Sequence, residues 1–337
     1  MTGGWIARKS RAMTTQETPV PKKAFAVRVH AFGGNDQLKY EEVDVIPPGE
    51  GEVLIRLSAA GVNPVDWKIV RGYLNSGIPA KMPFVPGWEL SGTIVQRGHA
   101  ARRFAVGDRV YAYVRRPTVE NGCYAEYVTA PECYLAAAPE EIPLEAAAGV
   151  PLAGLTAWQS LHDAAKIQRG ETVLIIGASG GVGGFGVQLA KVAGADVIAV
   201  ASQANSAYVL GLGADEFLGY DKGSLEAMFA AHAKKADVIF DCTGGDTYVK
   251  SRPVLKDGGR VVSIATRNPP PGFEGVPYQY VFVEPNSVQL RKLAALVDEG
   301  RLTVHIHQRT ALAQAKKALD QSETGHTRGK VVLVTAD

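Results

Sequence analysis

Hydrophobic and polar residues follow two different patterns along this chain. Between residues 24 and 137, short apolar runs alternate with polar positions, and turn-forming residues separate the runs at 53–63, 84–95, 106–114 and 123–130. A period of two residues with frequent turn signals is typical of short β-strands. The first pattern therefore predicts a small, barrel-like β domain.

The pattern changes near residue 148, where apolar runs of strand length alternate with segments of helical period. Strands are expected at 172–177, 196–201, 216–220, 237–245, 259–265 and 280–285. Helices are expected after the first of these strands, up to Leu212, near 224–233 and over 287–300, and a helix and a last strand (within 325–334) close the chain. Repeated β–α units predict an α/β fold with a parallel, doubly wound sheet.

Composition narrows the class of protein. The chain has 337 residues, enough for two domains, and 36 Lys and Arg against 34 Asp and Glu give a net charge of +2. This balance predicts neither a nucleic-acid nor a membrane partner, and no apolar run reaches the ~20 residues of a membrane span. Three cysteines without a CxxC pair indicate a reducing compartment, so we expect a cytoplasmic protein.

The first 23 residues follow neither pattern. We expect a disordered N-terminal tail over residues 1–23, with Met13 as an alternative start. Arg8, Lys9 and Arg11 would suit a transit peptide, but the segment lacks the apolar core of a secretory signal. The tail is therefore left out of the fold prediction.

The most informative segment is LIIGASGGVGGFGVQLAK, residues 174–191. A strand leads into the glycine-rich turn 177–183, and a helix and a second strand follow, which is the context of a dinucleotide-binding motif. Small residues let the backbone approach a pyrophosphate at a helix N-terminus, so the expected cofactor contacts are Ala178, Ser179, Gly180, Gly181 and Val182. Gly183, Gly186 and Ala190 would let the helix pack close to the sheet. A glycine-rich turn of another α/β fold is the alternative.

The end of the second strand bears on the choice between NADPH and NADH. An NAD site usually has an acidic residue about 20 residues after the motif, but no acid occurs between Asp196 and Asp215. A 2′-phosphate therefore meets no repulsion there, and its expected donors are Ser202, Asn205, Tyr220 and Lys222. The prediction is NADPH as cofactor, with the alternative that Ser202 only caps the next helix.

Further motifs accompany this turn in a fixed order: AAGVNPVDWKI (59–69), PFVPGWELSG (83–92), VGDRVYA (106–112), PLAGLTAWQSL (151–161), LGAD (212–215) and GHTRGKVVL (325–333). Together they resemble the medium-chain dehydrogenase/reductase superfamily, in its zinc-free quinone oxidoreductase (zeta-crystallin-like) branch. The resemblance implies a GroES-like, β-rich catalytic domain made from both ends of the chain, residues 24–147 and 284–337. A Rossmann NADP-binding domain, residues 148–283, would be inserted between them.

The resemblance also bears on metal binding. Zinc-dependent relatives place catalytic ligands at positions that align here with Asn63, Trp88 and Ala153, and none of these side chains suits zinc. His305 and His307 would share a strand face, but no third ligand accompanies them. We therefore expect no metal.

The same resemblance assigns site residues. It implies a substrate cleft between the domains, and the predicted catalytic residues are Asn63, Asp66, Lys68 and Tyr73. Many members carry Tyr in place of Lys68, so Lys68 is either a hydrogen-bond donor to a substrate carbonyl or a solvated lysine. Asn63 is either a substrate contact or a turn cap. Trp88 either forms a wall of the cleft against a flat substrate ring or belongs to the core. Further cofactor contacts are expected at Thr156, Ile264, Ala265, Thr266, Phe282, Val283, Arg328 and Lys330. The alternative for Arg328 and Lys330 is plain surface charge.

Reduction without a metal favours acceptors that spread negative charge by conjugation. The predicted function is therefore a zinc-independent, NADPH-dependent reductase of a quinone or an α,β-unsaturated carbonyl. The alternatives are an alkenal or enone double-bond reductase, an enoyl-thioester reductase, and a non-catalytic NADPH-binding sensor. An unpaired sheet edge near residues 280–283 predicts a homodimer.

Overall fold

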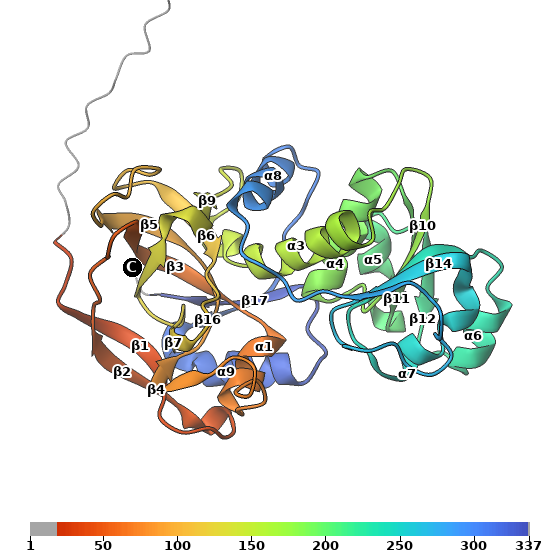
Figure 1. Ribbon diagram of the computed structural model, residues 1–337, viewed down its shortest axis with the longest axis horizontal. Helices are drawn as coiled ribbons and strands as arrows, with labels where there is room; N and C mark the ends of the chain where they lie inside the picture. Colours follow the sequence, from red (N-terminus) through yellow and green to blue (C-terminus); the bar gives the residue numbers. More distant parts are fainter. Residues whose placement is uncertain (1–18, 336–337) are drawn as a thin grey trace, which may run out of the picture.

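The computed structural model describes residues 19–335, arranged in two lobes that lie side by side in Figure 1. Most of the predicted tail, residues 1–18, lies outside the described residues, and the first strand begins at Lys23. The β-rich lobe contains the beginning and the end of the chain, and the middle of the chain forms the other lobe. No helix among the described residues has the length and apolar character needed to cross a membrane.

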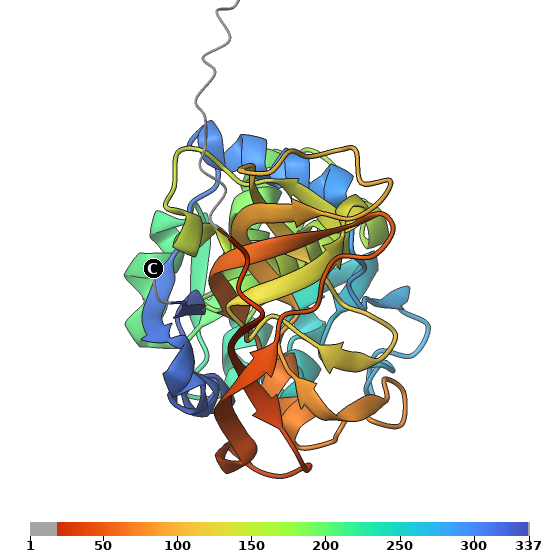
Figure 2. The same ribbon diagram turned by 90° about the vertical axis from the view of Figure 1, so that its left-hand side faces the viewer.

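Two sheets form the β-rich lobe, which faces the viewer in Figure 2. A seven-stranded sheet has the order β16-β17-β3-β5-β6-β9, with β8 paired to β3; its strands are β3 (Glu52–Val62), β5 (Glu89–Arg97), β6 (Arg109–Tyr113), β8 (Tyr127–Pro131), β9 (Leu135–Ala137), β16 (Ile306–Ala311) and β17 (Lys330–Val334). A four-stranded sheet has the order β2-β1-β4-β7, formed by β1 (Lys23–Val29), β2 (Leu38–Asp44), β4 (Ala80–Val85) and β7 (Val119–Asn121). Because β17 pairs antiparallel with β3, the last strand completes a sheet that the first part of the chain begins.

The other lobe contains a six-stranded parallel sheet with the order β12-β11-β10-β13-β14-β15. Its strands are β10 (Thr172–Ile176), β11 (Asp196–Ala201), β12 (Glu216–Gly219), β13 (Ala236–Asp241), β14 (Leu255–Ser263) and β15 (Tyr278–Tyr280). Strands β10, β11 and β13 consist mainly of buried apolar residues, as expected for a sheet covered on both faces. The predicted doubly wound parallel sheet is confirmed.

Short helices connect and cover these sheets. They are α1 (Pro64–Val70), α2 (Leu144–Ala147), α3 (Pro151–Trp158), α4 (Gly181–Val192), α5 (Ser206–Gly211), α6 (Leu225–Ala231), α7 (Gly245–Val249), α8 (Ser287–Asp298) and α9 (Ala315–Glu323). A π-helical turn, Gln159–Ala164, extends α3. Single 3₁₀ turns lie at Asn35–Gln37, Glu132–Tyr134, Gln203–Asn205, Arg252–Val254 and Leu312–Gln314.

The strand expected at 280–285 differs from the structure, where β15 ends at Tyr280 and residues 281–286 are irregular. A side chain replaces the strand partner at this point. The Gln159 amide donates to Glu284 O (2.8 Å) and accepts from Glu284 N–H (2.9 Å). The segment therefore leaves the parallel sheet and passes to α8, which packs on the β-rich lobe through a hydrogen bond from the Tyr111 hydroxyl to Leu290 O.

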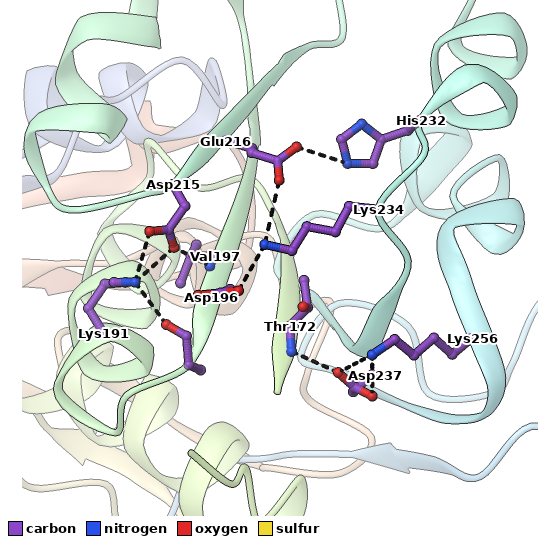
Figure 3. A network of polar contacts seen from close by, with 11 residues as sticks. Thr172, Lys191, Asp196, Val197, Asp215, Glu216, His232, Lys234, Asp237 and Lys256 are labelled. Carbon is purple, nitrogen blue, oxygen red and sulfur yellow. Dashed lines mark hydrogen bonds and ion pairs between the residues drawn. The ribbon is translucent and has the colours of Figure 1, made fainter. Parts of the chain in front are cut away.

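A network of polar contacts fixes the amino-terminal ends of the parallel strands (Figure 3). Asp215 accepts hydrogen bonds from Lys191 Nζ (2.8 Å) and from Val197 N–H (2.8 Å), which ties the start of β11 to the end of α4. Lys234 Nζ lies 2.9 Å from Asp196 at the same edge. Ligands of such sheets bind at the opposite, carboxyl-terminal edge, so Asp215 of the LGAD segment has a structural role.

Candidate active site

The glycine-rich turn lies at the carboxyl end of β10 and leads directly into α4. Gly177 has φ +79°, a conformation that favours glycine, and the N–H groups of Gly177 and Ala178 donate to Val200 O at 3.1 and 3.0 Å. The first α-helical hydrogen bond runs from Gly184 N–H to Gly180 O (2.8 Å). The N–H groups at the start of α4 therefore have no acceptor within the helix and are available to an anion.

Two glycines of α4 lie against close neighbours. A Cβ atom on Gly183 would collide with the carbonyl of Gly177, and one on Gly186 would lie 3.1 Å from the Phe240 ring of β13. Ala190, the next residue of this stripe, is fully buried. The small-residue stripe therefore allows the turn to close and the helix to lie close on the sheet.

The C-terminal segment before β17 contacts this turn. Gly329 N–H donates to Ser179 O (2.9 Å), and Gly329 forms an isolated parallel bridge with Gly180. A Cβ atom on Gly181 would lie 2.7 Å from Cδ of Lys330, so the Lys330 stem covers the start of α4. Residues 329–330 of the β-rich lobe are thus built directly onto the phosphate-binding turn.

Two of the residues predicted for the NADPH 2′-phosphate, Ser202 and Asn205, come together with Arg328 at the end of β11. The Asn205 amide donates to the Ser202 hydroxyl (2.9 Å) and accepts from Arg328 Nε (2.7 Å). Arg328 also donates to Ala204 O (3.2 Å), and its guanidinium lies over the Tyr208 ring, 5.4 Å from the centroid. Arg328 and Asn205 remain partly exposed, so this cluster offers a cation and polar donors to an anion.

Tyr220 lies at the end of β12 beside the same loop and is 37% exposed. Its neighbour Asp221 accepts a hydrogen bond from Gln203 N–H (2.8 Å). One carboxylate therefore approaches the loop from β12, although none lies within β11 or the turn after it. The sequence prediction considered only the residues between Asp196 and Asp215 and did not weigh Asp221.

The ends of β13 and β14 form the other side of the carboxyl-terminal edge. Asp241 accepts from the N–H groups of Thr243 and Gly244 and from the Ser263 hydroxyl (2.7 Å). Ser263 Oγ in turn accepts from the N–H groups of Ala265 (3.1 Å) and Thr266. Burial raises the pKa of the Asp241 carboxyl. These bonds fix the predicted cofactor-lining turn 264–266 onto the sheet.

The remaining predicted cofactor contacts lie on α3 and on the segment after β15. Thr156 is buried, and its hydroxyl donates to Leu152 O (2.6 Å), so only its oxygen lone pairs are free for a ligand. Val283 is buried, and Phe282 lies beneath the Arg115 guanidinium at 5.1 Å. Their roles at the nicotinamide stay predictions.

Lys330 is placed differently from the prediction. Its ammonium is buried and donates to Glu89 Oε1 (2.7 Å), Asn63 Oδ1 (2.5 Å) and Val62 O (3.1 Å). All three donors of the ammonium are therefore used inside the protein. The prediction offered two alternatives for Lys330, a direct contact with the ribose or pyrophosphate and a plain surface charge. The structure shows neither, because the ammonium forms a buried ion pair.

Asn63 belongs to the same buried cluster. Its Nδ2 donates to Glu89 Oε1 (2.7 Å), while its Oδ1 accepts from Lys330. Only 3% of Asn63 is exposed. Glu89 and Lys330 therefore fix which way round the amide lies, and one N–H hydrogen of Asn63 remains without an acceptor among residues 19–335.

Asp66 does not reach the surface of any cleft, which corrects its predicted contact with substrate. It is fully buried at the first turn of α1, where its Oδ2 accepts from Asn63 N–H (2.8 Å) and from the Tyr124 hydroxyl (2.9 Å). Its Oδ1 has no hydrogen-bond partner among the described residues. Burial raises the pKa of Asp66 to about 7, against the effect of these two hydrogen bonds.

Lys68 and Tyr73 lie apart from this cluster, on the outer side of α1 and the turn after it. The Lys68 ammonium lies 5.4 Å from the centre of the Trp67 ring, and the Tyr73 ring meets the same ring edge-on at 6.2 Å. Tyr73 is 64% exposed and Lys68 is exposed as well, and partial desolvation of its ammonium lowers the pKa of Lys68. The four predicted catalytic residues thus form two groups, a buried pair and an exposed pair.

The segments that carry the three zinc-ligand positions meet at Glu89. Glu89 follows Trp88, binds the Asn63 amide, and accepts from Leu152 N–H (2.7 Å), next to Ala153. Trp88 is buried and packs edge-on against Tyr113, which makes it core. No group of three or more His, Cys, Asp or Glu residues within 19–335 could hold a metal ion.

Two important residues of the site were missed by the sequence analysis. Glu89 is a fully buried carboxylate at the start of β5, and Tyr208 carries the Arg328 guanidinium. A charge inside WELSG was the available signal for Glu89, because a buried carboxylate requires a partner. For Tyr208 no sequence signal exists, since its partner follows 120 residues later.

Comparison with known proteins agrees with this geometry. A family model described as "Alcohol dehydrogenase GroES-like domain" matches residues 49–140, and one described as "Zinc-binding dehydrogenase" matches residues 212–333. The chain is 34% identical to a chloroplastic quinone-oxidoreductase homolog of Spinacia oleracea, over 89% of this chain and 95% of that protein. The chain belongs to the quinone oxidoreductase branch of the medium-chain dehydrogenases/reductases.

Two further members of this family are similar over nearly the whole chain. A chloroplastic NADPH-dependent alkenal/one oxidoreductase of Arabidopsis thaliana is 35% identical, over 95% of this chain and 81% of that protein. The structure of the quinone oxidoreductase from Coxiella burnetii superposes with a TM-score of 0.85 at 31% identity, covering 94% of this chain and all of that one. The predicted combination of a GroES-like lobe and a Rossmann lobe is therefore confirmed.

Proposed function

We propose that this protein is an NADPH-dependent, zinc-independent reductase that transfers hydride to a quinone or an α,β-unsaturated carbonyl. The observation that carries the proposal is that a dinucleotide-binding turn and a cluster suited to phosphate lie on the same edge of the parallel sheet. The cluster, at the end of β11, consists of Ser202, Asn205 and Arg328. The names of the spinach, Arabidopsis and Coxiella relatives support the reaction class.

The residues present fit a bound dinucleotide. The turn 177–181 would hold the pyrophosphate through N–H groups at the start of α4, where a Cβ on Gly183 would collide with the Gly177 carbonyl. The turn 264–266 and Thr156 would lie along the nicotinamide half. The nicotinamide supplies the hydride, and the protein's task is to orient it and to keep competing acceptors away.

NADPH is favoured over NADH because a guanidinium lies at the end of β11, where a 2′-phosphate would bind. Arginine binds phosphate by charge-assisted hydrogen bonds, and Arg328 is held by Asn205 and by the face of Tyr208. Asp221 approaches the same loop, and its carboxylate is engaged with Gln203 N–H. A 2′-phosphate would take the remaining donors of Arg328 and the Ser202 hydroxyl.

Independence from zinc follows from the donor set. An amide, an indole and a methyl group stand at Asn63, Trp88 and Ala153, and none of them is a zinc ligand. An acceptor that delocalises the incoming negative charge needs only a hydrogen-bond donor at its carbonyl oxygen. The remaining N–H of Asn63 is our candidate for that donor, and Lys68 and Tyr73 are the candidates at the exposed side of α1.

The proposal also covers the domain limits, the oligomeric state and the location of the protein. The domain limits stay at 24–147 with 284–337 and at 148–283. The edge strand β15 is the expected contact of a homodimer, because pairing there would cover an open sheet edge. A cytoplasmic location is retained, although the two plant relatives are named chloroplastic.

The proposal is tested by steady-state assay of NADPH consumption in the presence of a chelator. Substrates are a small quinone and a small alkenal in parallel, and NADH replaces NADPH in a second series. The account expects turnover with NADPH in chelator, and the better acceptor assigns the substrate class. Tight NADPH binding without turnover of either acceptor would instead favour the non-catalytic sensor.

A further inference from the structure

The two-residue segment Gly329–Lys330 is in contact with both halves of the proposed site. On one side, Gly329 N–H donates to Ser179 O (2.9 Å), and the Lys330 stem packs on Gly181. On the other side, the Lys330 ammonium donates to Asn63 Oδ1 (2.5 Å) and Glu89 Oε1 (2.7 Å). The backbone of Gly329 and the side chain of Lys330 together therefore connect the phosphate-binding turn to the Asn63 amide.

The contacts of Lys330 decide the orientation of the Asn63 side chain. An amide has a donor end and an acceptor end, and the two ends are easily exchanged by rotation. Lys330 is a pure donor and meets Oδ1, while the Glu89 carboxylate is an acceptor and meets Nδ2. In the reversed amide, Nδ2 would face the Lys330 ammonium, donor against donor, and Oδ1 would face the Glu89 carboxylate, acceptor against acceptor. Such pairs are costly inside a cluster that excludes water.

Glu89 extends this arrangement to the helix that follows. Its second oxygen accepts from Leu152 N–H at the start of α3 (2.7 Å). Lys330, Glu89 and Asn63 are all at most 4% exposed, so water does not compete for these bonds. The cluster is therefore a rigid connection between β17, β3, β5 and the beginning of α3.

We propose that Lys330 is a positioning residue, which couples the phosphate-binding turn to the orientation of the Asn63 amide and aims its free N–H at the substrate carbonyl oxygen. This rests on the proposed function. Lys330 touches neither cofactor nor substrate and acts through Asn63. This role differs from a direct phosphate contact, in which the Lys330 ammonium would bind the cofactor itself.

The working variant is the double replacement K330M/E89Q. K330M alone would leave Glu89 as an unpaired buried carboxylate, which is strongly destabilising. The double variant removes both charges with little change in shape, and circular dichroism and a thermal melt verify that it is folded. It is compared with N63A, with the triple variant, and with wild type.

Gln188→Met is the matched control. Gln188 on α4 accepts from Thr303 N–H (2.7 Å) and donates to Thr303 O (3.2 Å), so it also joins the two lobes. It has no contact with Asn63 or Lys330. Its loss therefore reports the general effect of weakening the contact between the lobes.

The first readout separates cofactor binding from turnover. In K330M/E89Q, the Kd for NADPH should stay within about threefold of wild type, while kcat falls about 100-fold, the loss expected from a misplaced positioning group. Q188M should stay within about threefold in both quantities. A loss of NADPH affinity above about tenfold would instead show that the ammonium binds the cofactor and would overturn the proposal.

The second readout is the double-mutant cycle. N63A should lower kcat in the wild-type background but change it less than about threefold in the K330M/E89Q background, because both changes remove the same aimed donor. Full additivity, or no effect of N63A in wild type, would overturn the proposal. Hydrogen exchange gives an independent check: NADPH should slow exchange of the backbone amides of Asn63, Val65 and Asp66 in wild type and not in K330M/E89Q.

Failure of the proposed function gives a different result. Wild type that neither binds NADPH nor reduces any conjugated acceptor would refute the reductase assignment. Wild type that does both, with losses that simply add in the cycle, would refute only the role of Lys330.

Discussion

Replacing Asp66 with asparagine should change how the stability of this protein depends on pH. Asp66 is fully buried at the start of α1, and burial raises its pKa from the ordinary 3.8 to about 7. Hydrogen bonds from Asn63 N–H and the Tyr124 hydroxyl oppose the shift. Glu89 raises this pKa further and Lys330 lowers it, and both remain unchanged in the variant.

The sign follows from proton binding. Between pH 4 and 7 the folded protein keeps the Asp66 proton, whereas the unfolded chain has lost it. Stability contributed by this group is therefore complete below about pH 4 and is lost as pH rises through about 7. The difference between 3.8 and about 7, at 1.36 kcal/mol per pKa unit, gives a total loss of about 4 kcal/mol.

The assay is the free energy of unfolding in urea for wild type and D66N at half-unit steps between about pH 5 and 8. The amide introduced by D66N cannot ionise, and its nitrogen would take the position of the Asp66 Oδ1, which has no partner within residues 19–335. The wild-type advantage over D66N should shrink by about 1.4 kcal/mol per pH unit between about pH 5 and 6, and then level off above about 7. Parallel curves, or a wild type that gains on D66N as pH rises, would refute the assignment of a neutral buried Asp66.

Three other predictions follow from the structure. R328Q should weaken NADPH binding about 10- to 100-fold and leave NADH binding within about threefold, because Arg328 is the proposed contact of the 2′-phosphate. The exposed control R301Q should not show this difference, and equal losses with both cofactors in R328Q would contradict the proposal. G183A should cost about 1–3 kcal/mol in urea unfolding, since its Cβ would collide with the Gly177 carbonyl, whereas G211A has no atom within 4 Å of its Cβ and should be neutral or stabilising. Light scattering at micromolar concentration should give twice the chain mass of 35.8 kDa, and a monomer would refute dimerisation through β15.

Local patterns were enough to predict the parallel sheet and the glycine-rich turn. The strand residues 172–176 and the glycines at 183 and 186 act through neighbours close in the sequence or through a general packing rule, so their roles can be read directly. The strand at 280–285 was misplaced because its competitor is the side chain of Gln159, which is distant in sequence.

The site was predicted less completely, for the same physical reason. Arg328 and Lys330 are two residues apart in a basic segment, yet one lies partly exposed beside Asn205 and the other is buried against Glu89. The direction of each side chain depends on how β17 pairs with β3, and no local pattern contains that register. The resemblance to the family placed Asp66 at the substrate, whereas its position in the first turn of α1 directs its carboxylate to a backbone N–H.

The central claim is hydride transfer from NADPH to a conjugated carbonyl without a metal. The most direct test is the rate of NADPH loss with a small quinone and a small alkenal, using enzyme dialysed against a chelator and assayed in it. The account predicts turnover of at least one acceptor, unchanged by added zinc and slower with NADH at equal concentration. Activity that disappears in chelator and returns with zinc would contradict the account.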